Sequence, residues 1–410
     1  MAESGRRVIQ LGQQVIGPEL PRVNTARARK PGDYPDVPRA YLDAAQRLSS
    51  PLALGPPLCD ELIALVRHVF TEEEAAVVRH LRLFPGRTAS GVAKAEHRPV
   101  EQVEPILNRL AFTIRAIAAS GPDEKRHYHL LPVVPGMFEM VLIDQTPETM
   151  TGWHRRFAEL FEALFQTGFT LDYQSPPLTP AVRYLPIGRA IEAHPMALPS
   201  DRLEVVLDRF EVFGVGQCQC RLAMHAVGKG CGKPLGNCLV IGQWAERGIQ
   251  QGWLRPVDKT EALAVKAEAE SLGLVTWMMN VESSRGQCSC SCCGCCCHAL
   301  RMVSEFNVPS LFAPPHFLPR FDPARCTSCG KCARTCPMGA IVVDPGAKTQ
   351  EHRIQRCIGC GLCALACDRQ RAIAMEPVPD YKLPYWSWYA LIARAAPQML
   401  RSSWRVWRSR

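Results

Sequence analysis

The chain has 410 residues, of which 47% are hydrophobic and 21% are charged, and its formal net charge is +9. That length allows two to four domains with cores of their own, and the composition argues against extensive disorder. The sequence contains no apolar stretch long enough to span a membrane and no recognisable export signal, so we expect a cytoplasmic protein. In a reducing compartment, its 20 cysteines are better suited to metal binding or redox chemistry than to disulfides.

Composition and predicted elements divide the chain into six segments, and the fold class that we predict is α+β with several domains. The Arg- and Pro-rich start is expected to have little structure of its own. The segments are a basic, Pro-rich extension (1–56), a winged-helix-like domain (57–135), a helical connector (136–210), a cysteine-rich α/β region (211–310), a module with two copies of one cysteine motif (311–377) and a basic aromatic tail (378–410).

Three helices are predicted in the first half of the winged-helix-like domain. A capping box formed by Thr71 and Glu74 starts the first helix. The second helix is expected over 88–95. The third carries Val103 and Leu107 on one face, at the spacing of an amphipathic helix.

Two β-rich runs follow these helices, at 112–118 and 127–134, with a turn-like sequence between them. Three helices and a hairpin in this order resemble a winged helix-turn-helix. The third helix carries Glu101 and Glu104, so it offers no basic face for phosphates, and we do not expect nucleic acid to be a partner.

The cysteine-rich region holds eleven cysteines in two groups, separated by a helix that Asp258 starts and Gly273 ends. Neighbouring side chains diverge, so we do not expect all the adjacent cysteines to face one small ion. One larger cluster, two separate sites, or one cluster with a redox dithiol would each fit this field. The first group is Cys218, Cys220, Cys231 and Cys238; the second is Cys288, Cys290, Cys292, Cys293, Cys295, Cys296 and Cys297.

Two copies of one motif follow, each with two, two and three residues between successive cysteines. This spacing is that of bacterial ferredoxins with two 4Fe-4S clusters. In each copy, a tight loop points three sulfurs at one cluster, while the fourth cysteine, expected to start a helix, reaches the other cluster. The predicted ligands of cluster one are Cys326, Cys329, Cys332 and Cys367, and those of cluster two are Cys357, Cys360, Cys363 and Cys336.

The region 320–376 differs from an acidic ferredoxin in its charge. It contains nine Lys and Arg residues against five Asp and Glu residues, and Asp368 stands where proline is usual. Positive neighbours stabilise a reduced cluster, and they favour a redox partner with an acidic docking surface. Zinc sites also use paired cysteines, but two copies of the full motif favour clusters. A small β-hairpin is expected here, with arms at 340–344 and 353–355.

The tail 378–410 has six Lys and Arg residues and no acidic residue after Asp380. Its Trp and other apolar residues lie near one face of a predicted helix that Pro397 interrupts. Such a helix suits the anionic inner face of a membrane, or an acidic partner, although it could equally dock on its own protein.

Taken together, the upstream cysteine motifs and the repeated motif resemble those of bacterial and archaeal 4Fe-4S dicluster domain-containing proteins. The resemblance covers roughly residues 55–376. It implies iron–sulfur binding and redox work, and it implies no substrate. For Cys218, Cys220, Cys231 and Cys238 as metal ligands, we favour iron–sulfur over zinc.

The function that we predict is that of an iron–sulfur electron-transfer protein or redox subunit. It would bind two 4Fe-4S clusters, with an additional cluster or zinc ion in the upstream cysteine field. One alternative is an iron–sulfur enzyme, an oxidoreductase component with its chemistry at 288–297. The other is a redox-sensing regulator that binds DNA through the winged helix. No flavin or nicotinamide motif is present.

Overall fold

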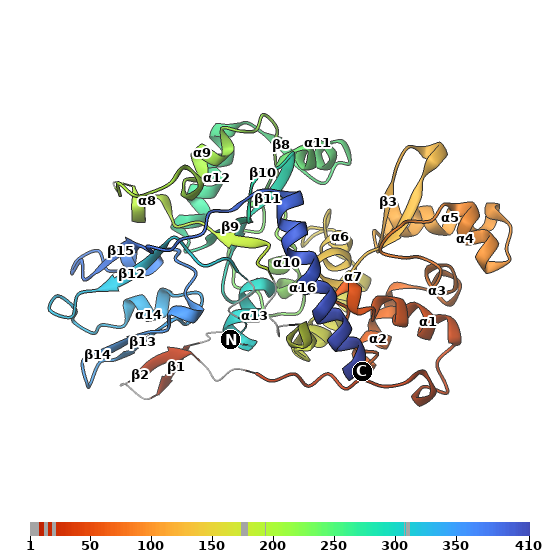
Figure 1. The fold of residues 1–410 in the computed structure, drawn as a ribbon, viewed down its shortest axis with the longest axis horizontal. Helices are drawn as coiled ribbons and strands as arrows, with labels where there is room; N and C mark the ends of the chain where they lie inside the picture. Colours follow the sequence, from red (N-terminus) through yellow and green to blue (C-terminus); the bar gives the residue numbers. More distant parts are fainter. Residues whose placement is uncertain are drawn as a thin grey trace. The chain divides into compact units, whose positions relative to one another are not determined.

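The computed structural model describes residues 8–11, 15–18, 22–173, 179–192, 194–306, 308 and 312–410. The chain forms a mixed helix-and-strand fold with two compact units (Figure 1). Unit one comprises Met1–Arg22 and Pro177–Gln398, and unit two comprises Val23–Pro176 and Met399–Arg410.

Unit two is mainly helical, and its helices begin close to where the sequence predicts them. The Thr71 hydroxyl accepts a hydrogen bond from the Glu74 amide (3.2 Å), and the Glu74 carboxylate accepts one from the Thr71 amide (2.9 Å). This confirms the predicted capping box. The helices are α1 (Arg39–Leu48), α2 (Asp60–Val69), α3 (Glu72–Val78), α4 (Ala89–Glu96), α5 (Val100–Asn108), α6 (Phe138–Val141) and α7 (Gly152–Gln166).

Helix α1 lies inside the segment that we expected to have little structure. Leu42, Ala45 and Leu48 are buried on its inner face, where α1 packs against α2 and α3. The sequence analysis did not identify α1, because its amphipathic pattern is short and the sequence around it is rich in Pro and Arg.

The hairpin of unit two is shorter than predicted. Phe112 lies in a helical turn, not in a strand, because the chain continues from α5 through Arg109–Thr113 before it extends. The strands are β3 (Ile117–Ser120) and β4 (His127–Leu130), which pair antiparallel. The winged-helix assignment of this region remains a prediction.

Unit one contains a six-stranded antiparallel sheet with β11 near its centre. Cys288, Cys290 and Cys292 alternate along β11 and therefore share one face. The strands in sheet order are β5 (Val182–Tyr184), β9 (Val275–Met279), β11 (Gly286–Cys292), β7 (Cys238–Gly242), β6 (Phe213–Gly216) and β8 (Arg255–Val257).

Different elements cover the two faces of this sheet. α9 (Leu203–Leu207) and α12 (Lys259–Ser271) contribute to the core on one face. The other face, with Cys290 and Cys292, packs against α13 (His298–Phe306) and the C-terminal module. As predicted, Asp258 caps α12, accepting a hydrogen bond from the Glu261 amide at 2.7 Å, and Gly273 follows it in a left-handed conformation. α8 (Gly188–Ile191), α10 (Gln219–Ala226), α11 (Gln243–Gln250) and the strand pair β10 (Val281–Ser283) and β16 (Tyr385–Ser387) complete this part of the unit.

The C-terminal module consists of two short helices and two strand pairs. The hairpin has its second arm at β14, earlier than predicted, because the Asp344 carboxylate accepts hydrogen bonds from the amides of Gly346 and Ala347 and so closes a tight turn. The elements are α14 (Lys331–Thr335), α15 (Leu362–Ala366), β12 (Phe317–Phe321) with β15 (Ile373–Pro377), and β13 (Ile341–Asp344) with β14 (Thr349–His352). β1 (Val8–Leu11) and β2 (Val15–Pro18) extend the second pair into one sheet.

The last helix, α16 (Trp388–Ser409), continues through Pro397, which we expected to interrupt it. Proline removes one backbone donor there without ending the helix. Among the helices that the structure describes, none has the length and apolar character needed to cross a membrane.

Candidate metal centres

The module contains two cavities, and each is lined by four cysteines. Cys336, Cys357, Cys360 and Cys363 line one cavity, which we call cavity two. The other four cysteines, Cys326, Cys329, Cys332 and Cys367, line cavity one. In both cases three cysteines come from one motif and the fourth comes from the other. The structure therefore brings together the two crossed sets that the spacing predicts.

The loops of the two motifs turn backbone amides toward the sulfurs. Gly330 and Gly361 adopt left-handed conformations at the starts of α14 and α15, which a side chain would strain. Hydrogen bonds run from the amide of Ser328 to Cys326 Sγ (3.4 Å), from Ala340 to Cys336 Sγ (3.3 Å) and from Gly359 to Cys357 Sγ (3.5 Å). Such donors stabilise negative charge on a thiolate.

The fourth cysteine of each motif ends a helix, although we expected it to start one. Cys336 follows α14, and Cys367 follows α15. The glycine before each helix turns the chain so that the third cysteine lies inside the helix. One turn of helix then separates the third cysteine, at one cavity, from the fourth, at the other.

The two cavities differ in their exposure to solvent. Cys329 of cavity one is exposed, whereas Cys360 and Cys363 of cavity two are buried. Burial raises the pKa of Cys332 to about 11 and that of Cys357 to about 12, so these thiols stay protonated at neutral pH unless a metal replaces the proton.

A buried guanidinium accompanies cavity two. Arg356 is 5% exposed and donates to the carbonyls of Met338 (3.1 Å) and Ser304 (2.6 Å). Burial lowers the pKa of Arg356, and the neighbouring Cys336 sulfur opposes that shift. The hydrogen bond to Ser304 also ties the module to α13.

In the upstream field, four sulfurs converge on one point. The Sγ atoms of Cys231, Cys293, Cys295 and Cys296 all lie within 4.8 Å of one another. Cys231 and Cys293 are separated by 3.9 Å, and the adjacent Cys295 and Cys296 by 3.8 Å. We call these residues the four-cysteine group. Their convergence was not expected, because the sequence placed Cys231 with Cys218, Cys220 and Cys238, and adjacent side chains usually diverge.

Six other cysteines form a second neighbourhood, which we call the six-cysteine group. The sulfurs of Cys290 and Cys297, together with burial, raise the pKa of Cys292. The Cys297 sulfur, together with burial, raises the pKa of Cys220 in turn, and the Cys290 sulfur and burial raise that of Cys238. The members are Cys218, Cys220, Cys238, Cys290, Cys292 and Cys297.

Two cysteines lie outside both groups. Cys288 packs in an apolar cluster with Val240 and Leu254. Cys59 is 1% exposed, as predicted for a small core residue, and burial raises the pKa of its thiol to about 12.

Two buried cations flank the upstream field, and the sequence analysis missed the role of Lys266. Arg221 is 2% exposed and donates to the carbonyls of Pro234 (3.0 Å) and Ser291 (2.6 Å). Lys266 is 1% exposed and donates to the Cys290 carbonyl (2.8 Å) and the Ser291 hydroxyl (2.9 Å). Among the described residues, neither cation forms a close ion pair with a carboxylate, although the Glu270 carboxylate raises the pKa of Lys266. Buried charges normally have a partner of opposite sign, and thiolates would supply one here.

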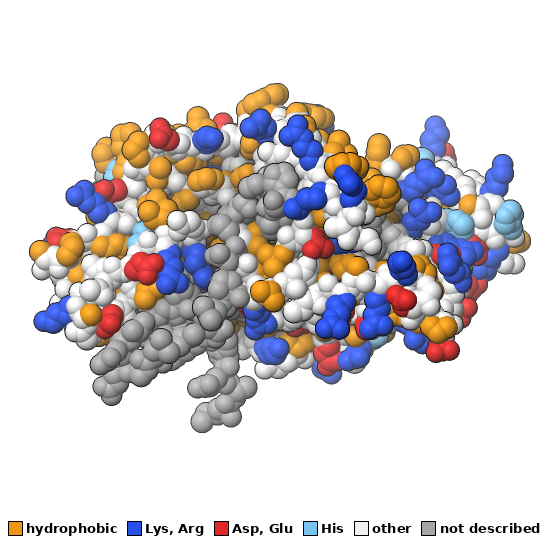
Figure 2. Space-filling view, turned by 60° about the horizontal axis from the view of Figure 1, so that its bottom comes forward, with side chains coloured by type: hydrophobic (Ala, Val, Ile, Leu, Met, Phe, Trp, Pro, Cys, Tyr) orange, Lys and Arg blue, Asp and Glu red, His pale blue; other side chains and the backbone are white. Residues whose placement is uncertain are grey.

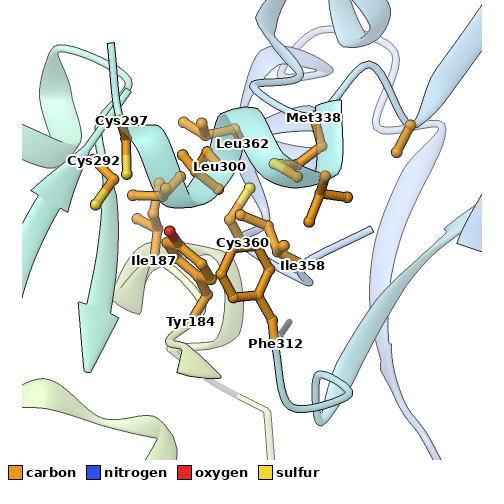
Figure 3. Close-up of a cluster of buried hydrophobic side chains, with 13 residues drawn as sticks. Tyr184, Ile187, Cys292, Cys297, Leu300, Phe312, Met338, Ile358, Cys360 and Leu362 are labelled. Atoms are coloured by element: carbon orange, nitrogen blue, oxygen red, sulfur yellow. The ribbon is translucent and has the colours of Figure 1, made fainter. Parts of the chain in front are cut away.

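A shared core joins the six-cysteine group to cavity two. Figure 3 shows Cys292 and Cys297 on one side of this core, with Cys360 and Ile358 on the other. The Tyr184 hydroxyl in the same core is buried and has no hydrogen-bond partner in the described part of the chain. Burial and the nearby cysteine sulfurs raise the pKa of this hydroxyl, so it remains a donor.

Comparison with known proteins places the module in a family. Residues 318–368 match the 4Fe-4S dicluster domain. The chain matches no curated protein and no solved structure. The match covers both cysteine motifs and agrees with the two cysteine-lined cavities. The chain therefore contains a 4Fe-4S dicluster domain at residues 318–368.

Proposed function

We propose that the chain is an iron–sulfur electron-transfer protein or redox subunit whose module binds two 4Fe-4S clusters. The observation that carries this proposal is the crossed lining of two separate cavities by four cysteines each. Four thiolates are the donor set of a 4Fe-4S cube, and amide donors to the sulfurs fit its negative charge. Each cluster, when bound, would supply one-electron chemistry.

Short covalent paths support transfer between the two clusters. α14 carries Cys332 at cavity one and ends at Cys336 at cavity two. α15 connects Cys363 to Cys367 in the opposite sense. Two helices of five residues therefore join the cavities, and a pair of clusters held in this way serves electron transfer better than it serves a purely structural role.

In this proposal, electrons are exchanged with a partner at cavity one. Cys329 is exposed there, and five exposed basic residues lie on the same motifs: Arg325, Lys331, Arg334, Arg369 and Arg371. A partner with an acidic docking surface would complement them. Figure 2 shows Lys and Arg side chains spread over the face that it presents, with Asp and Glu side chains among them. The basic side chains gather at cavity one because they lie within a few residues of the cysteines that line it.

The six-cysteine group favours a third redox centre, which we propose is an additional iron–sulfur cluster. The observations that support it are the unpartnered Tyr184 hydroxyl, which could donate to a cluster sulfur, and the core shared with cavity two. Its sulfurs do not converge as those of the four-cysteine group do, which suits a cluster larger than a single ion. Electrons would then pass from cavity one through cavity two to this centre.

Anaerobic purification followed by iron and sulfide analysis and EPR spectroscopy tests this proposal. Two clusters in the module and one in the six-cysteine group predict about twelve irons per chain. The dithionite-reduced protein should show magnetically coupled 4Fe-4S signals from the two module clusters. About eight irons would contradict the third cluster alone, whereas fewer than about six, or uncoupled signals, would contradict the two-cluster module.

The exposed face of α16 leads us to propose contact with an anionic membrane surface. Tyr389, Ile392, Leu400, Trp404 and Trp407 are each more than half exposed. Four exposed arginines of α16 lie among these residues: Arg394, Arg401, Arg405 and Arg408. Aromatic side chains interleaved with arginine suit the headgroup region of a bilayer. Cosedimentation with phosphatidylserine vesicles but not with phosphatidylcholine vesicles is expected, and loss of that difference at low salt would contradict the contact.

A further inference from the structure

The distances between the sulfur atoms of the four-cysteine group indicate whether the group could hold a single metal ion or a 4Fe-4S cluster. Four sulfurs at about 2.3 Å from one tetrahedral ion are separated from each other by about 3.8 Å. The Cys231–Cys293 and Cys295–Cys296 separations are 3.9 Å and 3.8 Å. In a 4Fe-4S cube each thiolate binds its own iron, so its four thiolates must stand further apart. The measured spacing therefore fits one ion.

No other group in the described part of the chain converges in this way. The four-cysteine group is the one set of three or more His, Cys, Asp or Glu residues there whose ligand atoms all lie within 4.8 Å of one another. The eight cysteines of the module line open cavities instead. The close approach is thus particular to these four sulfurs and is not a general property of cysteine-rich segments in this protein.

The four sulfur ligands and the charged residue beside them favour zinc over other metals. Four thiolates in tetrahedral geometry leave no open position, which is typical of structural zinc. Zn²⁺ with four thiolates carries a net charge of −2. The buried Arg221, beside Cys293, would offset part of that charge, and its own position is fixed by the carbonyls of Pro234 and Ser291.

Such an ion would hold two irregular segments together. Cys231 lies in the loop between α10 and β7, residues 227–237, which contains no helix or strand. The other three ligands lie in the turn between β11 and α13. At Gly294 in that turn, a Cβ atom would lie 2.2 Å from the Pro337 carbonyl oxygen, so the turn packs closely against the residue after Cys336. Gly294 is needed for this close approach, because a side chain there would meet the Pro337 backbone.

We propose that Cys231, Cys293, Cys295 and Cys296 bind one structural Zn²⁺ ion. The ion fixes the 227–237 loop to the 293–296 turn. The zinc site does not depend on the proposed electron transfer.

Zinc analysis of the full-length protein, purified anaerobically with its iron, tests the proposal. We expect about one zinc per chain and a zinc K-edge spectrum with four sulfur neighbours at about 2.3 Å. Cys295→Ser should lose zinc to the chelator 4-(2-pyridylazo)resorcinol at least about tenfold faster than the unmodified protein. Cys288→Ser, on the strand β11 that leads into this turn but outside the group, is the matched control and should retain its zinc.

A second variant guards against a simple folding defect. Cys231→His keeps a zinc ligand, so it should retain the ion with three sulfurs and one nitrogen around it, whereas Cys231→Ser should not. Iron content should stay unchanged in all four variants, which separates this site from the clusters. Absence of zinc from the unmodified protein, loss of iron with Cys295→Ser, or equal zinc loss from Cys288→Ser would each overturn the proposal.

Discussion

The module and the upstream field of unit one use cysteine in two different ways. In the module, four sulfurs line each cavity, and one turn of helix separates the third and fourth cysteines of each motif. In the upstream four-cysteine group, the four sulfurs all lie within 4.8 Å of one another. Each site has four cysteines, so the distance between the sulfurs, rather than the number of cysteines, indicates whether a site suits a cluster or a single ion. One arrangement has room for a cluster and the other for one ion.

Cavity one and the four-cysteine group also differ in their exposure to solvent. Cavity one opens to solvent through Cys329, as an electron-exchange site requires. Cys293 and Cys296 are buried at 2% and 0% exposure against Met224 and Leu274, as suits a structural site. A redox role and a structural role can therefore occupy neighbouring segments of one chain.

The largest expected effect comes from removing a ligand in cavity two. Cys363→Ser should lose about four irons per chain and abolish the magnetic coupling between the module clusters, because cavity two would keep three thiolates. Cys293→Ser should leave iron unchanged and remove zinc. Iron and zinc analysis of both variants checks this. Similar metal losses in both would mean that the two regions form one site.

Removing a positive charge near cavity two should change the reduction potential of its cluster without changing the metal content of the protein. Arg356→Gln removes a buried cation beside Cys336. A positive neighbour stabilises the reduced cluster, so we expect the potential of the cluster in cavity two to fall by on the order of tens of millivolts. EPR-monitored redox titration measures this shift. Lys348→Gln, at the exposed hairpin turn, is the control and should leave the potential unchanged.

Charge at cavity one should affect partner binding instead. Reversal of two exposed charges in Lys331→Glu/Arg334→Glu is expected to slow reduction of an acidic acceptor protein about tenfold at low salt. The effect should shrink toward unity above about 0.5 M salt, because screening removes the electrostatic steering. Stopped-flow reduction measures both rates. A salt-independent decrease would indicate a structural defect rather than docking.

The smallest effect should come from unit two and should leave both metals untouched. Glu96 accepts hydrogen bonds from Arg79 (2.9 Å) and His80 (2.6 Å). Burial alone would raise the pKa of Glu96, but Arg79 and His80 outweigh it and lower the pKa below 4.5. Glu96→Gln should therefore lower the free energy of unfolding by about 1 kcal/mol at pH 7.

The stability difference between Glu96→Gln and the unmodified protein should also depend on pH, in a direction that follows from the lowered pKa of Glu96. A carboxyl whose pKa is depressed in the folded state adds stability above its unfolded pKa and loses it as the pH falls. The difference between Glu96→Gln and the unmodified protein should therefore be present in full above pH 4.5 and shrink as the pH falls through the lower, folded-state pKa, while zinc and iron contents at pH 7 stay equal. Urea unfolding at several pH values measures it. A difference that grows on acidification would contradict the assignment.

The sequence predicted the module better than the upstream field for a physical reason. In the module, local spacing within a loop and one helical turn places every sulfur, so the crossed sets could be read from the chain. In the upstream field, Cys231 meets its neighbours across 62 residues, through the packing of a loop against a turn. Spacing along the chain carries no record of that contact.

The buried position of Lys266 could not be predicted either. Lys266 reads as an ordinary surface charge, and only the packing of α12 on the sheet buries it. Helix starts at Thr71 and Asp258 were predictable because capping depends on residues three apart. α1 and the helical turn at Phe112 were missed because tertiary packing outweighed local composition.

Anomalous diffraction from crystals of the intact protein tests the central claim most directly. Data collected on both sides of the iron and zinc absorption edges would locate each metal separately. We predict iron peaks in cavity one and cavity two and a single zinc peak among Cys231, Cys293, Cys295 and Cys296. Iron at the four-cysteine group, or zinc in either cavity of the module, would contradict the claim that sulfur spacing distinguishes the two sites.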